Sequence, residues 1–241
     1  MKIWKEIKLQ IRLLRRVLQD FRKGAWGQFS RIGDSGKPNF RHSISLSQPI
    51  RSSATLENKL VNIRLACARI EPVTIYPGQI FSFWEIVGKP SATNGFRRSR
   101  NIINGRLSED VGGGLCQVSG ILYHLALLTG LVVTERHAHS LDIYREEERH
   151  TPLGADATVV FGYKDLRLVN PYLFPVAFSF EISDNQLICK LLSNVLIEKK
   201  TVEFRRTSAD GHEKVTAILI SESIEKVLAE SQYEKISPQV N

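Results

Sequence analysis

Cysteine is scarce in this sequence, which has three among 241 residues: Cys67, Cys116 and Cys189. An odd number leaves one thiol unpaired under any disulfide pattern, and none of the three belongs to a Cys-x-x-Cys pair. These features exclude a disulfide framework and the common paired-cysteine zinc sites. They predict a reduced protein of the cytoplasm.

Long apolar runs are also missing. No stretch reaches the roughly 18 apolar residues that a membrane-spanning helix requires. The basic N-terminal segment does not resemble a secretory signal either, because Arg12, Arg15 and Arg16 interrupt its apolar residues. We therefore expect neither a spanning helix nor a secretory signal in this sequence.

Positive charge is concentrated at one end of the chain. Residues 1–23 contain eight Lys or Arg and two acidic residues, and so hold +6 of the formal net charge of +8. The rest of the chain is nearly balanced, which does not indicate an evenly basic groove for nucleic acid. We expect no nucleic-acid partner.

The same N-terminal segment has the spacing of an amphipathic helix. Its apolar residues recur at steps of three and four, which places them in one stripe; they are Ile3, Ile7, Ile11, Leu14, Leu18 and Phe21. Such a helix could lie on an anionic membrane surface. It could equally pack on the body of the protein, or on a partner, with its charges in solvent.

Helices are expected early in the remaining chain and strands late. Frequent Gly, Pro and Ser residues predict an irregular linker over 24–52. Helical spacing predicts one helix over 54–70, with Cys67 on its buried face, and another over 115–129 that ends at Gly130. Expected strands are 73–76, 132–136, 157–163, 166–169, 176–182, 186–192, 202–206 and 215–220, with a hairpin over 102–107 and a terminal helix over 221–231. This order predicts an α+β fold: two core helices packed on a mainly antiparallel sheet, plus the N-terminal helix. The predicted units are 1–52, 53–193 and 194–241.

Three glycines, Gly112 to Gly114, stand directly before Leu115 and Cys116 at the expected start of a helix. Glycine permits backbone conformations that other residues avoid. A cysteine in the first turn of a helix is close to the positive end of the helix dipole, which favours the reactive thiolate. If this chain carries chemistry, Cys116 is the first candidate.

A nucleophilic cysteine needs a base, and the base needs an orienting group. His137 and His139 follow on the next extended segment, and Asp156 and Asp165 come later. Papain-like and transglutaminase-like enzymes use this order of cysteine, histidine and acid. We expect Cys116 as nucleophile and His139 as base, with either Asp156 or Asp165 as orienter.

His137 and Gln117 are expected to assist at the same site, Gln117 through its side-chain amide. Two alternatives remain open. Cys116, His137 and His139 could be three ligands of a zinc ion. They could also form a purely structural cluster in a protein that binds but does not catalyse.

Six longer motifs occur in order between residues 50 and 193. They are Tyr76-Pro77-Gly78-Gln79-Ile80-Phe81-Ser82-Phe83-Trp84, Val87-Gly88, Gly112-Gly113-Gly114-Leu115-Cys116-Gln117-Val118-Ser119, Glu135-Arg136-His137-Ala138-His139-Ser140, Asp156-Ala157-Thr158-Val159 and Tyr163-Lys164-Asp165-Leu166. In this order they resemble the VanW family, an accessory product of some glycopeptide-resistance clusters that is found more widely in bacteria.

The resemblance implies a bacterial source and an association with vancomycin resistance and the cell envelope; it does not supply a reaction. The residues themselves predict a cysteine-dependent hydrolase or acyltransferase acting on an amide or ester bond. We expect a cell-wall precursor or another peptide-like molecule as substrate, and no cofactor. The expected location is the cytoplasm, with peripheral membrane attachment if residues 1–23 bind lipid.

Overall fold

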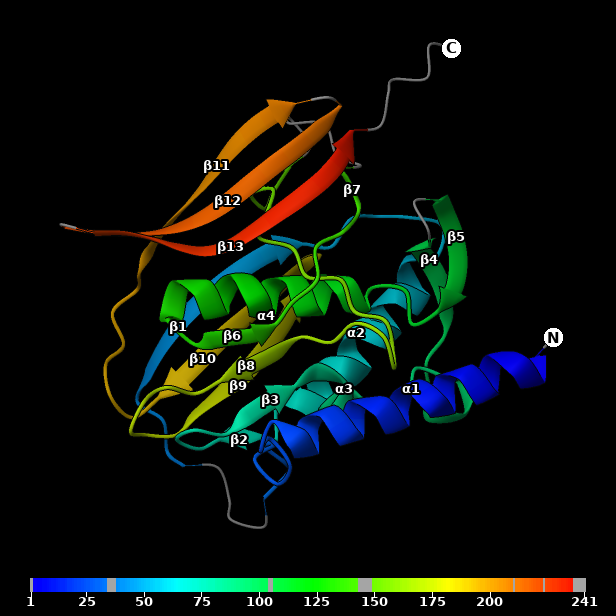
Figure 1. Cartoon of the computed structure of the whole chain (residues 1–241), viewed down its shortest axis with the longest axis horizontal. Helices are drawn as coiled ribbons and strands as arrows, with labels where there is room; N and C mark the ends of the chain where they lie inside the picture. Colours follow the sequence, from blue (N-terminus) through cyan, green and yellow to red (C-terminus); the bar gives the residue numbers. More distant parts are fainter. Residues whose placement is uncertain are drawn as a thin grey trace.

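A computed structural model describes residues 2–33, 38–103, 106–142, 149–209, 211–222 and 224–235 (Figure 1). The helices in this part of the chain are α1 (Lys2–Arg22), α2 (Leu56–Ile70), α3 (Phe83–Val87) and α4 (Leu115–Thr129), with the 3-10 turn η1 (Ala92–Asn94). The strands are β1 (His42–Pro49), β2 (Thr74–Ile75), β3 (Ile80–Ser82), β4 (Arg98–Ile103), β5 (Arg106–Val111), β6 (Val132–Glu135), β7 (Leu141–Asp142), β8 (Arg167–Val169), β9 (Val176–Ser183), β10 (Gln186–Ser193), β11 (Thr201–Ala209), β12 (His212–Ser221) and β13 (Ile224–Lys235).

The described strands form four sheets. Their orders are β1-β10-β9-β2, β11-β12-β13-β7, β3-β8-β6 and β4-β5. The pairings of these named strands are antiparallel except for β13 with β7, which is parallel. The fold is therefore α+β with mainly antiparallel sheets, as the sequence predicted.

Helix α4 lies at the centre of the molecule, between the β11–β13 sheet and the β1, β9 and β10 strands (Figure 1). Its sequence is apolar on nearly every side, and most of its residues are buried. A helix of this composition belongs in a core, because no side of it prefers water. It ends at Gly130, whose φ of 75° is the left-handed cap expected there.

Helix α2 packs beside α4 and contributes Ile63, Ala66, Cys67 and Ile70 to the same core. Cys67 is 4% exposed, which confirms that its thiol is a core group. Cys189 of β10 is fully buried in the same cluster. Two of the three thiols are thus sealed from solvent.

The expectation of an irregular linker over 24–52 is wrong for residues 42–49, which form β1. Ile44 and Leu46 alternate with serines, and Leu46 lies opposite Cys189 of β10. Serine is not a typical strand residue. The Gly and Pro residues on either side also favoured a linker over a strand, despite the alternation of apolar residues and serines. Pairing with β10 supplies the backbone hydrogen bonds that stabilise this strand, whose residues have little local preference for one.

Two other expectations fail in the second half of the chain. The segment over 157–163 is not a ladder strand: Thr158 N–H donates to the His137 carbonyl at 2.8 Å, and the Ala157 carbonyl accepts from Ser119 Oγ at 2.6 Å. The terminal helix over 221–231 is instead β13, which pairs along β12. Its Glu, Lys and Ala residues favour a helix locally, but the neighbouring strand edge decides its conformation.

The hairpin over 102–107 is confirmed, since β4 and β5 are antiparallel and Ile103 lies opposite Arg106. Its Asn104-Gly105 turn lies outside the described residues. The hairpin of β9 and β10 is also confirmed, with Asp184 and Asn185 at positive φ in its turn.

Helix α1 lies along the outside of the molecule (Figure 1). Its apolar stripe faces away from the body: Ile7, Ile11, Leu14, Leu18 and Phe21 are all exposed. The helix does pack on the body, through Leu9, Leu13, Arg16 and Asp20, but the predicted apolar stripe lies on the other side of the helix. No helix within the described residues is long and apolar enough to cross a membrane.

Candidate active site

The glycine run before α4 forms a tight turn that only glycine fits well. Gly112 and Gly114 have φ of +93° and +102°, and a Cβ on Gly114 would lie 2.9 Å from Lys59 Cγ. Asn62 of α2, fully buried, donates its side-chain N–H to the Gly113 carbonyl at 2.9 Å. The turn is thereby anchored to α2, and it determines where α4 begins.

Cys116 is the second residue of α4 and is half-buried, unlike Cys67 and Cys189. Its sulfur lies 3.6 Å from Thr158 Oγ1 and 3.9 Å from the Val159 carbonyl oxygen. The first turn of a helix offers unpaired N–H groups and a positive dipole end. This position favours a thiolate over a neutral thiol.

His139 stands between Cys116 and Asp156. Its Nδ1 lies 2.8 Å from Asp156 Oδ2, and its backbone N–H donates to the same oxygen at 2.8 Å. Its ring also acts on the Cys116 thiol, whose pKa it lowers. Because Nδ1 is engaged by Asp156, Nε2 is the ring nitrogen left for the sulfur. The structure thus joins His139 to Asp156 by hydrogen bonds and places the His139 ring where it acts on the Cys116 thiol.

Asp156 is itself held by groups from two further segments. Arg136 donates to Asp156 Oδ1 at 3.0 Å and to the Asp156 carbonyl at 2.7 Å, and Tyr233 Oη donates to Oδ1. Arg136 also donates to Ser231 Oγ of β13. The carboxylate therefore has little freedom to turn away from His139.

The charges at the site reinforce one another. Burial alone would raise the pKa of Cys116, but the hydrogen bond and charge of His139 outweigh it and lower that pKa. Burial alone would lower the pKa of His139, but hydrogen bonds to Asp156 and Cys116 raise it to about 10. Asp156 has a pKa below its usual range, because His139 and Arg136 outweigh its burial. The lowered pKa of Cys116 favours the thiolate, and the raised pKa of His139 favours the imidazolium between that thiol and the Asp156 carboxylate.

The other predicted site residues have different partners. His137 Nε2 lies 3.1 Å from Glu135 Oε1, and the Gln117 side-chain N–H donates to the Pro49 carbonyl at 3.0 Å. Asp165, 2% exposed, accepts from Ser82 Oγ at 2.6 Å. Between the two aspartates, the structure places Asp156 on His139 and Asp165 in a structural network.

The zinc alternative needs Cys116, His137 and His139 to converge. Within the described part of the chain, no group of three or more His, Cys, Asp or Glu side chains is arranged to hold a metal ion. His137 faces Glu135, and the Nδ1 of His139 is occupied by Asp156. The arrangement suits nucleophilic chemistry better than metal binding.

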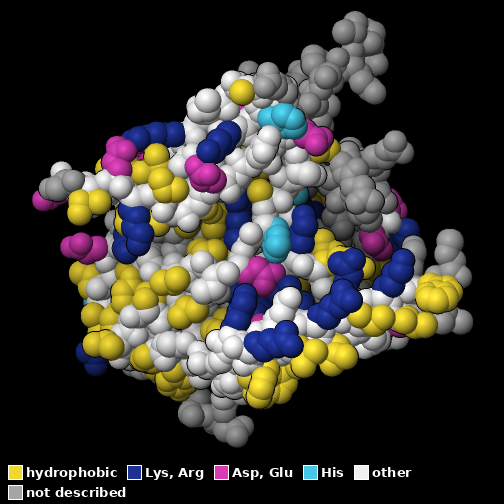
Figure 2. Space-filling model, in the orientation of Figure 1, with side chains coloured by type: hydrophobic (Ala, Val, Ile, Leu, Met, Phe, Trp, Pro, Cys, Tyr) yellow, Lys and Arg dark blue, Asp and Glu magenta, His cyan; other side chains and the backbone are white. Residues whose placement is uncertain are grey.

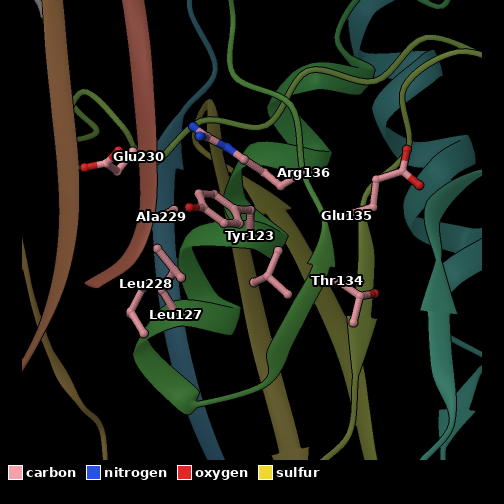
Figure 3. A pocket seen from close by; sticks show the side chains of 9 residues that line it. Tyr123, Leu127, Thr134, Glu135, Arg136, Leu228, Ala229 and Glu230 are labelled. Atoms are coloured by element: carbon pink, nitrogen blue, oxygen red, sulfur yellow. The ribbon is translucent and has the colours of Figure 1, made fainter. Parts of the chain in front are cut away.

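A cavity of about 230 Å³ lies behind this network, between α4, β6 and β13 (Figure 3). Arg136 extends across the Tyr123 ring, with its guanidinium 4.7 Å from the ring centroid, whereas Glu135 points away (Figure 3). The lining includes Arg136 but neither Cys116 nor His139. This cavity is therefore not the place where a substrate would meet the thiol.

Sequence reasoning missed Asn62, Arg136 and Tyr233, which position the predicted site. Arg136 stands directly before His137 and could have been suspected as a charged partner of an aspartate. Asn62 is one polar residue on an apolar helix, a weak signal for a buried anchor. Tyr233 lies 77 residues from Asp156 in the chain, and nothing in the sequence connects them.

The class defined by this geometry is an α+β protein with a Cys-His-Asp constellation at the start of a central helix. Residues 58–192 match the family described as VanW like protein, which is more than half of the chain. The chain therefore belongs to the VanW-like family.

Two curated relatives share this region. The chain is 32% identical over 139 residues to "Uncharacterized protein YoaR" of Bacillus subtilis, covering 58% of this chain and 44% of the relative. It is 33% identical over 114 residues to "Vancomycin B-type resistance protein VanW" of Enterococcus faecalis, covering 47% of this chain and 42% of the relative. The matched region thus spans less than half the length of either relative. No solved structure matches the chain.

Proposed function

We propose that this protein is a cysteine-dependent hydrolase or acyltransferase that acts on an amide or ester bond. The observation that carries the proposal is the pair of hydrogen bonds from His139 to Asp156, together with the effect of the same imidazole on Cys116, whose pKa it lowers. In this assignment Cys116 is the nucleophile, His139 the general base and acid, and Asp156 the orienter of the imidazole.

The proposed reaction has two steps. The Cys116 thiolate attacks the carbonyl carbon, a C–S bond forms, and His139 gives its proton to the leaving nitrogen or oxygen as the scissile bond breaks. Water then attacks the thioester, His139 accepts its proton, and the C–S bond breaks to release the acid. An amine or alcohol in place of water would make the same site an acyltransferase.

The environment of the thiol supports this assignment. A thiolate paired with an imidazolium needs no separate deprotonation before it attacks. The first turn of α4 adds the positive end of a helix dipole. Asp156, fixed by Arg136 and Tyr233, holds the ring in one orientation.

The name of one relative indicates a class of substrate. That relative is named for vancomycin resistance, in keeping with the cell-envelope association that the family resemblance implies. We therefore propose a peptide-like cell-wall precursor as the substrate of this chain. The three free cysteines support a reducing compartment, and hence the cytoplasm, as the place of reaction.

Thiol reactivity tests the assignment first. The rate of iodoacetamide labelling is measured against pH in the folded protein, with each cysteine resolved by mass spectrometry. Labelling of Cys116 at a pH well below the free-thiol value of about 8.5 is expected, and Cys116→Ser should abolish it. Cys67 and Cys189 are buried with raised pKa values, so they should label only after denaturation.

An activated ester tests the chemistry itself. Incubation with p-nitrophenyl acetate should release nitrophenol and leave an acetyl group on Cys116, and His139→Ala should slow both. If Cys116 labels only on denaturation and no acyl group forms, the cysteine is structural. The remaining assignment would then be a binding or accessory protein.

A further inference from the structure

The outer face of α1 is an exposed apolar stripe. It consists of Trp4, Ile7, Ile11, Leu14, Leu18 and Phe21, which are between 44% and 69% exposed. They follow one another at steps of three or four, so they form one line along a helix about 30 Å long. Figure 2 shows hydrophobic side chains along this edge of α1, with Lys and Arg side chains beside them. Monomeric proteins rarely expose a contiguous apolar patch of this kind unless it is an interaction site.

The opposite face of α1 is fixed to the body, so the helix cannot roll to bury the stripe. Arg16 donates to both carboxylate oxygens of Glu135, at 3.0 and 2.7 Å. Asp20, 7% exposed, accepts from Arg167 at 2.9 Å. The Arg12 guanidinium lies 3.8 Å from the Tyr163 ring centroid. Leu9 and Leu13 lie on the same face, close to Gly162, so the body-facing side of α1 is already occupied and the exposed stripe points outward.

The stripe is bordered by unpaired positive charge. Lys8, Arg15 and Arg22 are exposed, and by helical spacing they lie along one side of the stripe. Among the ion pairs of the described residues, none involves these three side chains. The two acidic residues of α1 are neutralised, Asp20 by Arg167 and Glu6 by Lys89. The outward face is therefore apolar in the middle and cationic at its edge.

We propose that α1 is a membrane-binding helix that lies in the surface of an anionic lipid bilayer. Apolar side chains would enter the boundary between headgroups and acyl chains, while Lys8, Arg15 and Arg22 pair with lipid phosphates. Trp4 and Phe21, at the two ends of the stripe, are aromatic residues suited to this interface. A second copy of the chain is a poorer occupant, because two helices of like charge would repel each other.

Membrane binding through α1 would also orient the candidate active site. Arg16 binds Glu135, and Glu135 directly precedes the segment of Arg136 and His139. The helix and the site are thus joined by a short rigid connection. The body would be held at the bilayer in one orientation, independent of whether Cys116 performs chemistry.

Vesicle flotation of the full chain tests the proposal. Phosphatidylcholine vesicles with about one third phosphatidylglycerol should bind the protein, and pure phosphatidylcholine vesicles should bind it more weakly. Leu14→Ser with Leu18→Ser should weaken binding by about tenfold or more, since both side chains leave the acyl boundary. Lys8→Gln, Arg15→Gln and Arg22→Gln together should weaken binding to anionic vesicles and remove its salt dependence.

Matched controls separate this surface from general stickiness. Leu173→Ser and Leu196→Ser alter side chains that are 96% and 72% exposed elsewhere on the molecule, and they should bind as the parent does. Cys116→Ser should also bind as the parent does, which keeps this test independent of the proposed function. Circular dichroism confirms that each variant is folded.

Two results would overturn the proposal. One is the absence of binding to anionic vesicles by the folded parent chain. The other is a dimer in light scattering that Leu14→Ser with Leu18→Ser converts to a monomer, with vesicle binding unaltered. That second result would assign the stripe to a second copy.

Discussion

His139 makes two contacts to a single oxygen of Asp156: its Nδ1 and its backbone nitrogen each lie 2.8 Å from Oδ2. One contact sets the orientation of the ring and the other sets the position of the chain. Rotation of the ring would break the first contact, whereas the second depends only on the position of the backbone. The same ring lowers the pKa of the Cys116 thiol.

Asp156→Asn should raise the pKa of Cys116, because the carboxylate stabilises the imidazolium that stabilises the thiolate. Each pKa unit lowers the thiolate fraction about tenfold at a pH below both values. Iodoacetamide labelling near pH 6 should therefore slow by about tenfold or more. His137→Ala should leave the rate unaltered, since His137 faces Glu135. Equal effects of the two substitutions would remove Asp156 from the site.

Tyr233→Phe should loosen the hydrogen bonding that holds Asp156, although Tyr233 lies outside the residues that match the family. The substitution removes the O–H that donates to Asp156 Oδ1 and should cost about 1 kcal/mol of unfolding free energy. Labelling of Cys116 should slow by less than in Asp156→Asn. Tyr163→Phe is the control, because Tyr163 is 42% exposed and should not alter either measurement. Urea unfolding and labelling kinetics provide the two readouts.

Gly114→Ala should destabilise the protein more than Gly78→Ala does. Both glycines have positive φ, but a Cβ on Gly114 would meet Lys59 and Ile63, whereas a Cβ on Gly78 would meet nothing within 4 Å. The conformational strain is about 1–3 kcal/mol at each position, and Gly114 adds a steric term. Urea unfolding measures the free energy of unfolding of both variants. Similar losses would show that α2 shifts to make room for the new methyl group.

The stability contributed by His139 should vanish at high pH. Its pKa is raised from 6.5 to about 10 in the folded protein, so the folded state binds this proton more tightly than the unfolded chain does. The contribution is complete below pH 6.5 and is lost as pH rises through about 10. The stability difference between the parent and His139→Gln should therefore narrow from about pH 6 to about pH 10. A difference that widens over this range would contradict the assigned charge state.

Arg16→Gln should loosen α1 from the body. Arg16 and Glu135 are 22% and 21% exposed, so the pair is partly desolvated, and its loss should cost about 1–2 kcal/mol. Arg15→Gln, one residue away on the exposed face, should change stability by less than about 0.5 kcal/mol. Amide hydrogen exchange along α1 should quicken in Arg16→Gln alone. Equal exchange in both variants would show that other contacts suffice to hold the helix.

Several elements could be predicted because their local signals agree. The bounds of α4 are those predicted, since a glycine run precedes a mostly apolar helix and Gly130 follows it. The β9–β10 hairpin follows from alternation around Asp184 and Asn185. The errors at β1 and β13 share a cause: both segments have the local composition of another structure and become strands by pairing with β10 and β12.

The candidate site also combines residues that local sequence features indicate with a residue that only the fold brings to them. The sequence alone made Cys116 and His139 candidates, because glycines, a helix start and a histidine segment are local features. It left Asp156 and Asp165 as equal candidates, since either could reach the histidine on spacing alone. The tertiary structure decided between them by placing Asp165 beside Ser82, and Asp156 between His139 and Arg136.

The amphipathic pattern of α1 was likewise determined by the sequence, because helical spacing depends only on the order of residues. Which face of that helix would be buried was not. Arg16 and Asp20 pair with Glu135 and Arg167 across more than a hundred residues of chain. Together with Leu9 and Leu13, which lie against Gly162, they turn the apolar stripe outward. Side-chain periodicity is a local property, whereas the partner of a charged group depends on which distant segments the fold brings together.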